Sequence, residues 1–171
     1  MKKKILYLTL LIYTACLMQS TVSDYIEIAG IKPNLLLVVA ISIALIRKDM
    51  EAAFMGLTLG LAMDVLVGRT LGWYALCLFL ICFPIGLINQ KLYKENPLIP
   101  ISFVFFSSIA VETLYYMINF FLRGYQDIAF MFTRIIIPES IYNAAMTLIV
   151  YPVVLIVYRK LDKFDHVHTR L

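Results

Sequence analysis

The stretch GLTLGLAMDVLVGRTLG, residues Gly56–Gly72, decides the fold because small residues recur in it at a fixed spacing. Every fourth position is a glycine or an aspartate, namely Gly56, Gly60, Asp64, Gly68 and Gly72. Residues four apart share one face of an α-helix, with a drift of roughly 40° per step. Within one apolar helix, Gly56 and Gly60 would form a smooth stripe that lets another backbone approach closely. We therefore expect a helix built for close packing, with Asp64 at its outer end facing protein or water rather than lipid.

The composition of the chain indicates that this helix lies in a membrane. The chain has 171 residues, of which 62% are hydrophobic, and its mean hydropathy is +0.87. Soluble domains are roughly half apolar, and this length is typical of one domain. We predict an all-α polytopic membrane protein, with six transmembrane helices forming a single integral membrane domain over residues 1–171. The six apolar segments are Ile5–Val22, Pro33–Ile46, Ala52–Val67, Trp73–Ile88, Leu98–Leu122 and Ile135–Tyr158.

Two of these segments are short for a membrane span. Pro33–Ile46 has 14 residues and Ala52–Val67 has 16, whereas a span needs about 20 residues. A re-entrant hairpin is the alternative, but its tip, Arg47–Glu51, would place four charged residues at membrane depth, which is costly. We therefore favour two short crossings, with a locally thinned bilayer or with helices that flanking residues extend.

The distribution of basic residues predicts the orientation of the chain. With the N-terminus in the cytoplasm, 11 of the 15 lysines and arginines lie inside and four lie outside. This asymmetry follows the positive-inside rule, so we expect both termini in the cytoplasm and a multi-pass protein of the plasma membrane. The net charge of +4 adds attraction to anionic membrane lipids and gives no reason to expect a nucleic-acid partner. The segments expected outside are Ser23–Lys32, Gly68–Gly72 and Arg123–Arg134.

The N-terminal segment has an alternative interpretation. Lysines precede an apolar run, as in a signal peptide, and Tyr13–Cys16 resembles a lipoprotein cleavage site. However, the apolar run continues past Cys16 through Met18, where lipoproteins usually turn polar. We therefore favour a first helix that is retained in the membrane.

No motif in the chain points to catalysis, a cofactor or a metal. The sequence has no glycine-rich phosphate loop, no HExxH and no GxSxG. The three cysteines lie in apolar segments without a clear metal or redox spacing, and the two histidines of the C-terminal tail lack a nearby third ligand. An aspartyl dyad of Asp64 and Glu112 is disfavoured, because neither lies in the Gly-x-Gly-Asp context of intramembrane aspartyl enzymes. We therefore expect a protein that is not an enzyme.

Five further residues are candidates for structural roles. Glu112 is the deepest charge in the chain, and we favour an internal hydrogen bond to a hydroxyl or amide over a partner or a substrate. Pro33 opens the second apolar segment. Pro138 and Glu139 suit the first turn of a helix. Asn143, one turn later, is expected to point into the bundle or to a neighbour.

The two longer segments expected outside are candidates for partner binding. Ser23–Lys32 contains Tyr25, and Arg123–Arg134 contains Phe130 and Phe132 among polar residues. Such a mixture of aromatic and polar side chains suits a helix at the membrane interface. Anchoring to the membrane surface and binding of a partner are both compatible with this pattern.

Three stretches follow one another in a recognisable order. They are Lys32-Pro33-Asn34-Leu35-Leu36-Leu37, then Arg47 and Glu51 in the internal turn, then GLTLGLAMDVLVGRTLGWYAL over Gly56–Leu76. This order resembles the MreD family of rod shape-determining proteins of bacteria. Length and number of spans agree over the whole chain. The last two helices match by their character alone.

The resemblance implies a non-enzymatic scaffold of the elongasome, the machinery of lateral peptidoglycan synthesis and cell wall biogenesis. The family partners the single-span protein MreC. It is also linked to the actin homologue MreB, and to the glycosyltransferase RodA with its class B penicillin-binding protein. The family's fold is similar to that of the S subunits of energy-coupling-factor transporters, which implies a compact six-helix bundle in the bacterial inner membrane.

The alternative function is that of a substrate-binding S subunit of a vitamin-type transporter. Such subunits resemble one another in an Ala-xxx-Ala dock on their first helix. The first helix here has no such pair, since Ala15 stands alone. The gene neighbourhood would separate the two functions, because a cell-shape operon favours the first and genes for vitamin uptake favour the second.

Overall fold

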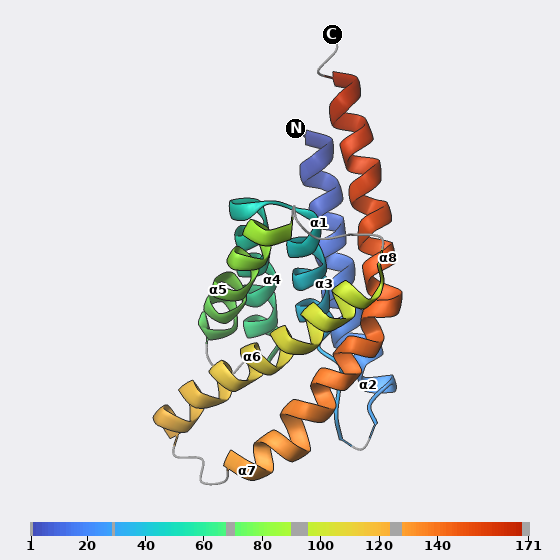
Figure 1. Ribbon diagram of the computed structural model, residues 1–171. Helices are drawn as coiled ribbons and strands as arrows, with labels where there is room; N and C mark the ends of the chain where they lie inside the picture. The colour runs from blue at the N-terminus through green and yellow to red at the C-terminus, as the bar shows by residue number, and fades with distance from the viewer. Residues whose placement is uncertain (1, 29, 68–70, 90–95, 124–127, 169–171) are drawn as a thin grey trace.

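The structure is a computed structural model that describes residues 2–28, 30–67, 71–89, 96–123 and 128–168. Within these residues it is all-helical, without a strand (Figure 1), as the sequence predicts. The helical elements in chain order are α1 (Lys2–Leu17), the π-helical η1 (Met18–Val22), α2 (Ser23–Tyr25), α3 (Leu35–Ile46), α4 (Asp49–Val67), α5 (Trp73–Ile88), α6 (Leu98–Arg123), α7 (Ile128–Met131), the π-helical η3 (Phe132–Ile136) and α8 (Ile137–His168).

Helix α3 forms the centre of the molecule. Its residues Leu35–Leu45 are all buried, and it contacts α1, α4, α5, α6 and α8. Figure 1 shows α3 between the α4–α5 pair and the α1–α8 side of the molecule. A helix that is apolar all round is expected in such a buried position. Its 12 residues extend only about 18 Å, but protein surrounds it, so its length need not match the thickness of a bilayer.

Among the described residues, three helical stretches are long and apolar enough to cross a membrane. They are Leu6–Tyr25, Leu98–Met117 and Ala129–Asp162. The shorter apolar helices α3 and α5 coincide with expected spans, and α5 has the bounds that the sequence predicts. Helix α4 begins at Asp49, three residues before the expected segment, so flanking residues do extend it.

The last helical run differs from the expectation. Elements α7, η3 and α8 follow one another without a break from Ile128 to His168. Part of the expected external loop is therefore helical. Pro138 and Glu139 lie in the first turn of α8, as the sequence predicts, but this turn continues directly from η3. A proline leaves a backbone carbonyl group of its helix without a hydrogen bond, and a π-helical segment such as η3 is one way in which a helix restores such bonds.

The glycine pattern does not lie in a single helix. Helix α4 ends at Val67, and Gly72 precedes α5 as its N-cap with φ of 98°. This left-handed conformation favours glycine, so Gly72 serves the turn rather than the stripe. Gly68 lies outside the described residues.

Candidate functional site

The glycine stripe packs against α5 of the same chain. A Cβ atom added at Gly60 would lie 2.5 Å from Cα of Ala75, and one added at Gly56 would lie 2.8 Å from the carbonyl oxygen of Leu78. No ordinary side chain fits at such distances, because the nearest atoms at Gly60 are backbone. The stripe therefore joins α4 to α5 within the molecule.

Asp64 lies at the end of this stripe and caps α5. Its Oδ1 accepts a hydrogen bond from the backbone N–H of Tyr74 at 3.1 Å. Its Oδ2 accepts from the N–H groups of Gly72 at 2.9 Å and Ala75 at 3.2 Å. The first N–H groups of a helix have no partner within the helix, and a carboxylate suits their partial positive charge. Asp64 is only 3% exposed, so it faces protein and fixes the start of α5.

Four helices meet around Asn34, the N-cap of α3. Its Oδ1 accepts from the backbone N–H of Leu37 at 3.0 Å, and its Nδ2 donates to the hydroxyl of Tyr74 at 3.1 Å. The Tyr74 hydroxyl in turn donates to a carboxylate oxygen of Glu112. The N–H of Asn34 donates to Oδ1 of Asn143 at 2.7 Å, whose Nδ2 donates to Ser108 at 3.1 Å. We call Asn34, Tyr74, Ser108, Glu112 and Asn143 the Asn34 cluster.

The segment before Asn34 is held by side chains of η1 and α2. The carbonyl oxygen of Pro33 accepts from Nε2 of Gln19 at 3.2 Å and from the hydroxyl of Ser23 at 3.4 Å. Oε1 of Gln19 accepts from the N–H of Leu35 at 2.6 Å. Pro33 itself is buried, and it lies one residue before the N-cap. These bonds fix how the chain enters α3.

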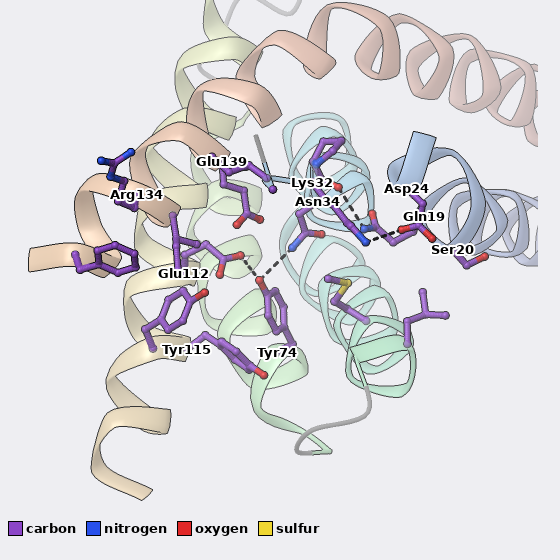
Figure 2. Close-up of a pocket in the computed structure, with 18 residues that line it drawn as sticks. Gln19, Ser20, Asp24, Lys32, Asn34, Tyr74, Glu112, Tyr115, Arg134 and Glu139 are labelled. Atoms are coloured by element: carbon purple, nitrogen blue, oxygen red, sulfur yellow. Dashed lines mark hydrogen bonds and ion pairs between the residues drawn. The ribbon is translucent and has the colours of Figure 1, made fainter. Parts of the chain in front are cut away.

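A cavity of about 880 Å³ lies beside the Asn34 cluster (Figure 2). Its wall comes from η1, α2, the segment before α3, and the helices α4 to α8. Figure 2 shows the side chains of Glu112 and Glu139 projecting into it, with Tyr74 and Asn34 beside them and Arg134 further out. The cavity therefore combines carboxyl groups, aromatic rings and a guanidinium group.

The opposite end of α3 carries a second polar group of side chains. Arg47, the residue after α3, forms ion pairs with Asp162 at 2.5 Å and with Glu51 at 3.7 Å. Its guanidinium carbon lies 4.6 Å from the ring centroid of Tyr158. Nδ2 of Asn89 donates to the carbonyl oxygens of Ala44, at 3.0 Å, and of Arg47. We call Arg47, Glu51, Asn89, Tyr158 and Asp162 the Arg47 cluster; none of its members lines the cavity.

Comparison with known proteins identifies the family. The family model for the rod shape-determining protein MreD matches residues 1–161. The chain belongs to the MreD family. Comparison with curated proteins and with solved structures returned no match, so no solved structure supports the expected likeness to transporter S subunits. Membership of this family implies a role in rod shape determination.

The structure brings together several of the residues that the sequence singled out. Pro33, Glu112 and Phe130 line the cavity, and Asn143 contacts Asn34 beside it. Tyr25 is 87% exposed and Phe130 56% exposed, while Phe132 is half-buried in η3. Their roles in partner binding stay predictions.

Sequence reasoning missed the connections between these residues. Asn34 after Pro33 and before an apolar run is an N-cap signal, so its role at the start of α3 could have been found. Nothing in the sequence indicates that Tyr74 joins Asn34 to Glu112, because these residues are 38 or more positions apart. Among the described residues, no group of three potential ligands is placed to hold a metal ion.

Proposed function

We propose that the chain is a non-enzymatic membrane scaffold of the elongasome, which binds MreC and joins a wider complex with RodA, a class B penicillin-binding protein and MreB. The observation that carries this proposal is membership of the MreD family over residues 1–161. The buried polar residues support it, since the carboxylates and amides of the bundle largely serve contacts between helices. Asp64 caps α5, for example, and Asn143 holds Asn34.

The proposed topology places six spans in the plasma membrane, with both termini in the cytoplasm. The distribution of basic residues supports it. In this orientation the Asn34 cluster and the cavity face the outer side, and the Arg47 cluster faces the cytoplasm. Labelling of single cysteines in a cysteine-free background tests the topology. Labelling from outside at Lys91 or Lys94 would contradict it.

The surface that we propose for MreC lies at the cavity end of the molecule. Figure 1 places α2 and α7 towards this end, and these elements carry the exposed rings of Tyr25 and Phe130. The hydroxyl of Tyr142 on α8 donates to the carbonyl oxygen of Ile26, which holds the Tyr25 segment against α8. Since α5 covers the glycine stripe, these rings are better candidates for a partner surface than the stripe.

Co-purification of the tagged full chain from mildly solubilised membranes tests the proposal. We expect MreC to be recovered with the chain in several detergents. The matched variants are Tyr25→Ala with Phe130→Ala, and Met50→Ala with Phe54→Ala, which alter exposed side chains of α4. The first pair should reduce recovery and the second should not. Absence of MreC in every detergent would contradict the proposal.

The cavity is the one observation that favours the alternative, a substrate-binding S subunit of a vitamin-type transporter. Its volume of about 880 Å³ is in the range of sites for small molecules. Tight binding of a vitamin, together with recovery of transporter subunits in place of MreC, would support that alternative.

A further inference from the structure

We propose that the cavity beside the Asn34 cluster binds a zwitterion that carries an ammonium group and a phosphate group a few atoms apart, which is the headgroup chemistry of an aminophospholipid. The inference rests on the cavity and its lining residues alone. It holds whether or not the chain binds MreC.

Two carboxyl groups form the part of the cavity wall that recognises the ammonium group. Glu112 on α6 is 3% exposed and accepts from the hydroxyl of Tyr74. The carboxyl group of Glu139 on α8 interacts with that of Glu112, and no ion pair joins either residue to a lysine or arginine among the described residues. A hydrogen bond joins the two carboxyl groups, so they share a proton, and the ammonium group of a ligand can take the place of that proton. A ligand with a positive charge is therefore favoured at this point.

Aromatic rings continue the wall next to the carboxyl groups. Tyr74, Tyr115 and Tyr116 all line the cavity. The ring centroids of Tyr74 and Tyr115 lie 4.6 Å apart, and those of Tyr115 and Tyr116 lie 6.1 Å apart. Organic ammonium groups are attracted to the faces of such rings. Carboxylates and aromatic rings together favour an organic ammonium group over a bare metal ion, which would require more oxygen ligands.

The phosphate group of the ligand would bind to a cationic side chain of the cavity wall. Lys32 is engaged, since its ammonium group pairs with Asp24 at 2.8 Å and with Glu27 at 3.4 Å. Arg134 is exposed and forms no ion pair with any carboxylate of the described residues. Figure 2 shows Arg134 further out than Glu139. A guanidinium group binds phosphate through two parallel hydrogen bonds, so Arg134 is suited to hold the anionic end of the zwitterion.

The size and the apolar part of the cavity favour a ligand larger than an amine alone. The cavity has a volume of about 880 Å³, whereas sites for small molecules occupy about 300–1,000 Å³. Met63 and Leu66 on α4 and Ile135 on η3 add apolar wall. This wall suits the glycerol group and the first acyl carbons that follow the headgroup of a lipid.

Binding to the delipidated full chain in detergent tests the proposal, with native mass spectrometry as the readout. The probes are phosphatidylethanolamine, free phosphoethanolamine, and phosphatidylglycerol, which has the phosphate without the ammonium group. We expect phosphatidylethanolamine to bind, and phosphatidylglycerol to bind at least about tenfold more weakly. Binding of free phosphoethanolamine as tightly as the lipid would identify the soluble zwitterion as the source.

Variants of the wall make the test specific. Glu112→Gln, Glu139→Gln and Arg134→Gln should each weaken binding by about tenfold or more, whereas the controls Glu27→Gln and Arg159→Gln should not. A glutamine at 112 still accepts from Tyr74, and Arg134 is exposed, so the melting temperature without lipid checks that the fold is kept. Should Glu112→Gln fail to fold, Arg134→Gln and Glu139→Gln decide the result.

Two results would overturn the proposal. One is equal binding of phosphatidylethanolamine and phosphatidylglycerol, or binding that none of the three wall variants changes. The other is recovery of MreC that Glu112→Gln and Glu139→Gln abolish while no zwitterion binds, since the cavity would then take a side chain of the partner. Loss of lipid binding in the variants with MreC still recovered would support the proposal and leave the scaffold function intact.

Discussion

The two ends of α3 are both fixed by polar side chains, but they differ in these side chains, and the cavity adjoins the Asn34 end. At the N-cap, the Asn34 cluster joins α3 to α5, α6 and α8 through buried amides, hydroxyls and a carboxylate. At the C-cap, the Arg47 cluster joins α3 to α4 and α8 through ion pairs between partly exposed groups. The cavity of about 880 Å³ lies at the first end.

This difference indicates that the Asn34 end is a candidate binding site, whereas the Arg47 end is a structural contact. The groups of the Arg47 cluster contact one another through ion pairs and the contact of Arg47 with Tyr158, and none of them lines the cavity. At the Asn34 end, Glu112, Glu139 and Arg134 face open volume. Equivalent changes at the two ends should therefore affect stability to different degrees, and only changes at the Asn34 end should affect function directly.

The largest effect is expected where α4 supports the Asn34 end. Gly60→Leu places a side chain against the backbone of Ala75, next to Tyr74. Overpacking typically costs about 1–3 kcal/mol and occasionally more. The atoms nearest to a Cβ at Gly60 are all backbone atoms of Tyr74 and Ala75, which cannot move aside as a side chain can, so we expect a cost at the upper end of this range. We expect strongly reduced membrane abundance on immunoblots and loss of rod shape. Leu57→Ala, on the same helix, is the control that should be tolerated; equal abundance of the two variants would refute close packing.

Removing the hydroxyl of Tyr74 should break the Asn34 cluster. Tyr74→Phe leaves the buried carboxylate of Glu112 and the amide of Asn34 without this partner, which is expected to cost about 2–3 kcal/mol. The melting temperature in detergent should fall accordingly. Tyr25→Phe removes a hydroxyl from an exposed ring and is the matched control. Equal melting temperatures would show that the hydrogen bonds of the cluster contribute little.

A slightly smaller effect is expected at Asp64. Both of its oxygens accept from backbone N–H groups of the start of α5. In Asp64→Asn, an amide NH₂ replaces one of these oxygens and faces an N–H donor, which should cost about 2 kcal/mol. Asp24→Asn changes an exposed carboxylate and should lower the melting temperature less. A wild-type melting temperature for Asp64→Asn would mean that the cap does not hold α5.

The smallest effect is expected at the Arg47 end. Arg47→Ala removes two ion pairs and the contact with Tyr158, but the side chain of Asp162 is 46% exposed. Solvent screening limits such pairs, so we expect a loss of about 1 kcal/mol. Lys48→Ala, at the neighbouring exposed residue, should have no effect. A larger loss for Arg47→Ala than for Tyr74→Phe would reverse the comparison between the two ends.

The sequence predicts the positions of the helices better than it predicts the turns and the contacts between them. Apolar runs locate α3 and α5 because composition alone marks a buried or membrane helix, and Trp73–Ile88 coincides with α5. The helical run through Pro138 was missed, because η3 accommodates a proline that normally marks a helix start. Gly72 follows the spacing of the glycine stripe but lies in the turn before α5, because a spacing of four does not distinguish a stripe from a turn.

The contacts within the site are harder to predict from the sequence than the helices are, for a physical reason. Asp64 and Glu112 each stand out as charges in apolar segments, but their partners are set by packing between distant helices. Tyr74 contacts both acids, since its backbone N–H donates to Asp64 and its hydroxyl donates to Glu112. A tyrosine within an apolar run does not indicate such contacts. The buried position of α3 likewise depends on how five other helices surround it.

Site-specific photo-crosslinking to MreC in cells tests most directly the claim that the cavity end of the molecule is the functional end. The crosslinker is placed at Tyr25, at Phe130, or at Met50, which is 57% exposed at the other end of the bundle. The account predicts crosslinks to MreC from Tyr25 and Phe130 and none from Met50. Crosslinks from Met50 alone, at equal abundance of the three variants, would contradict it.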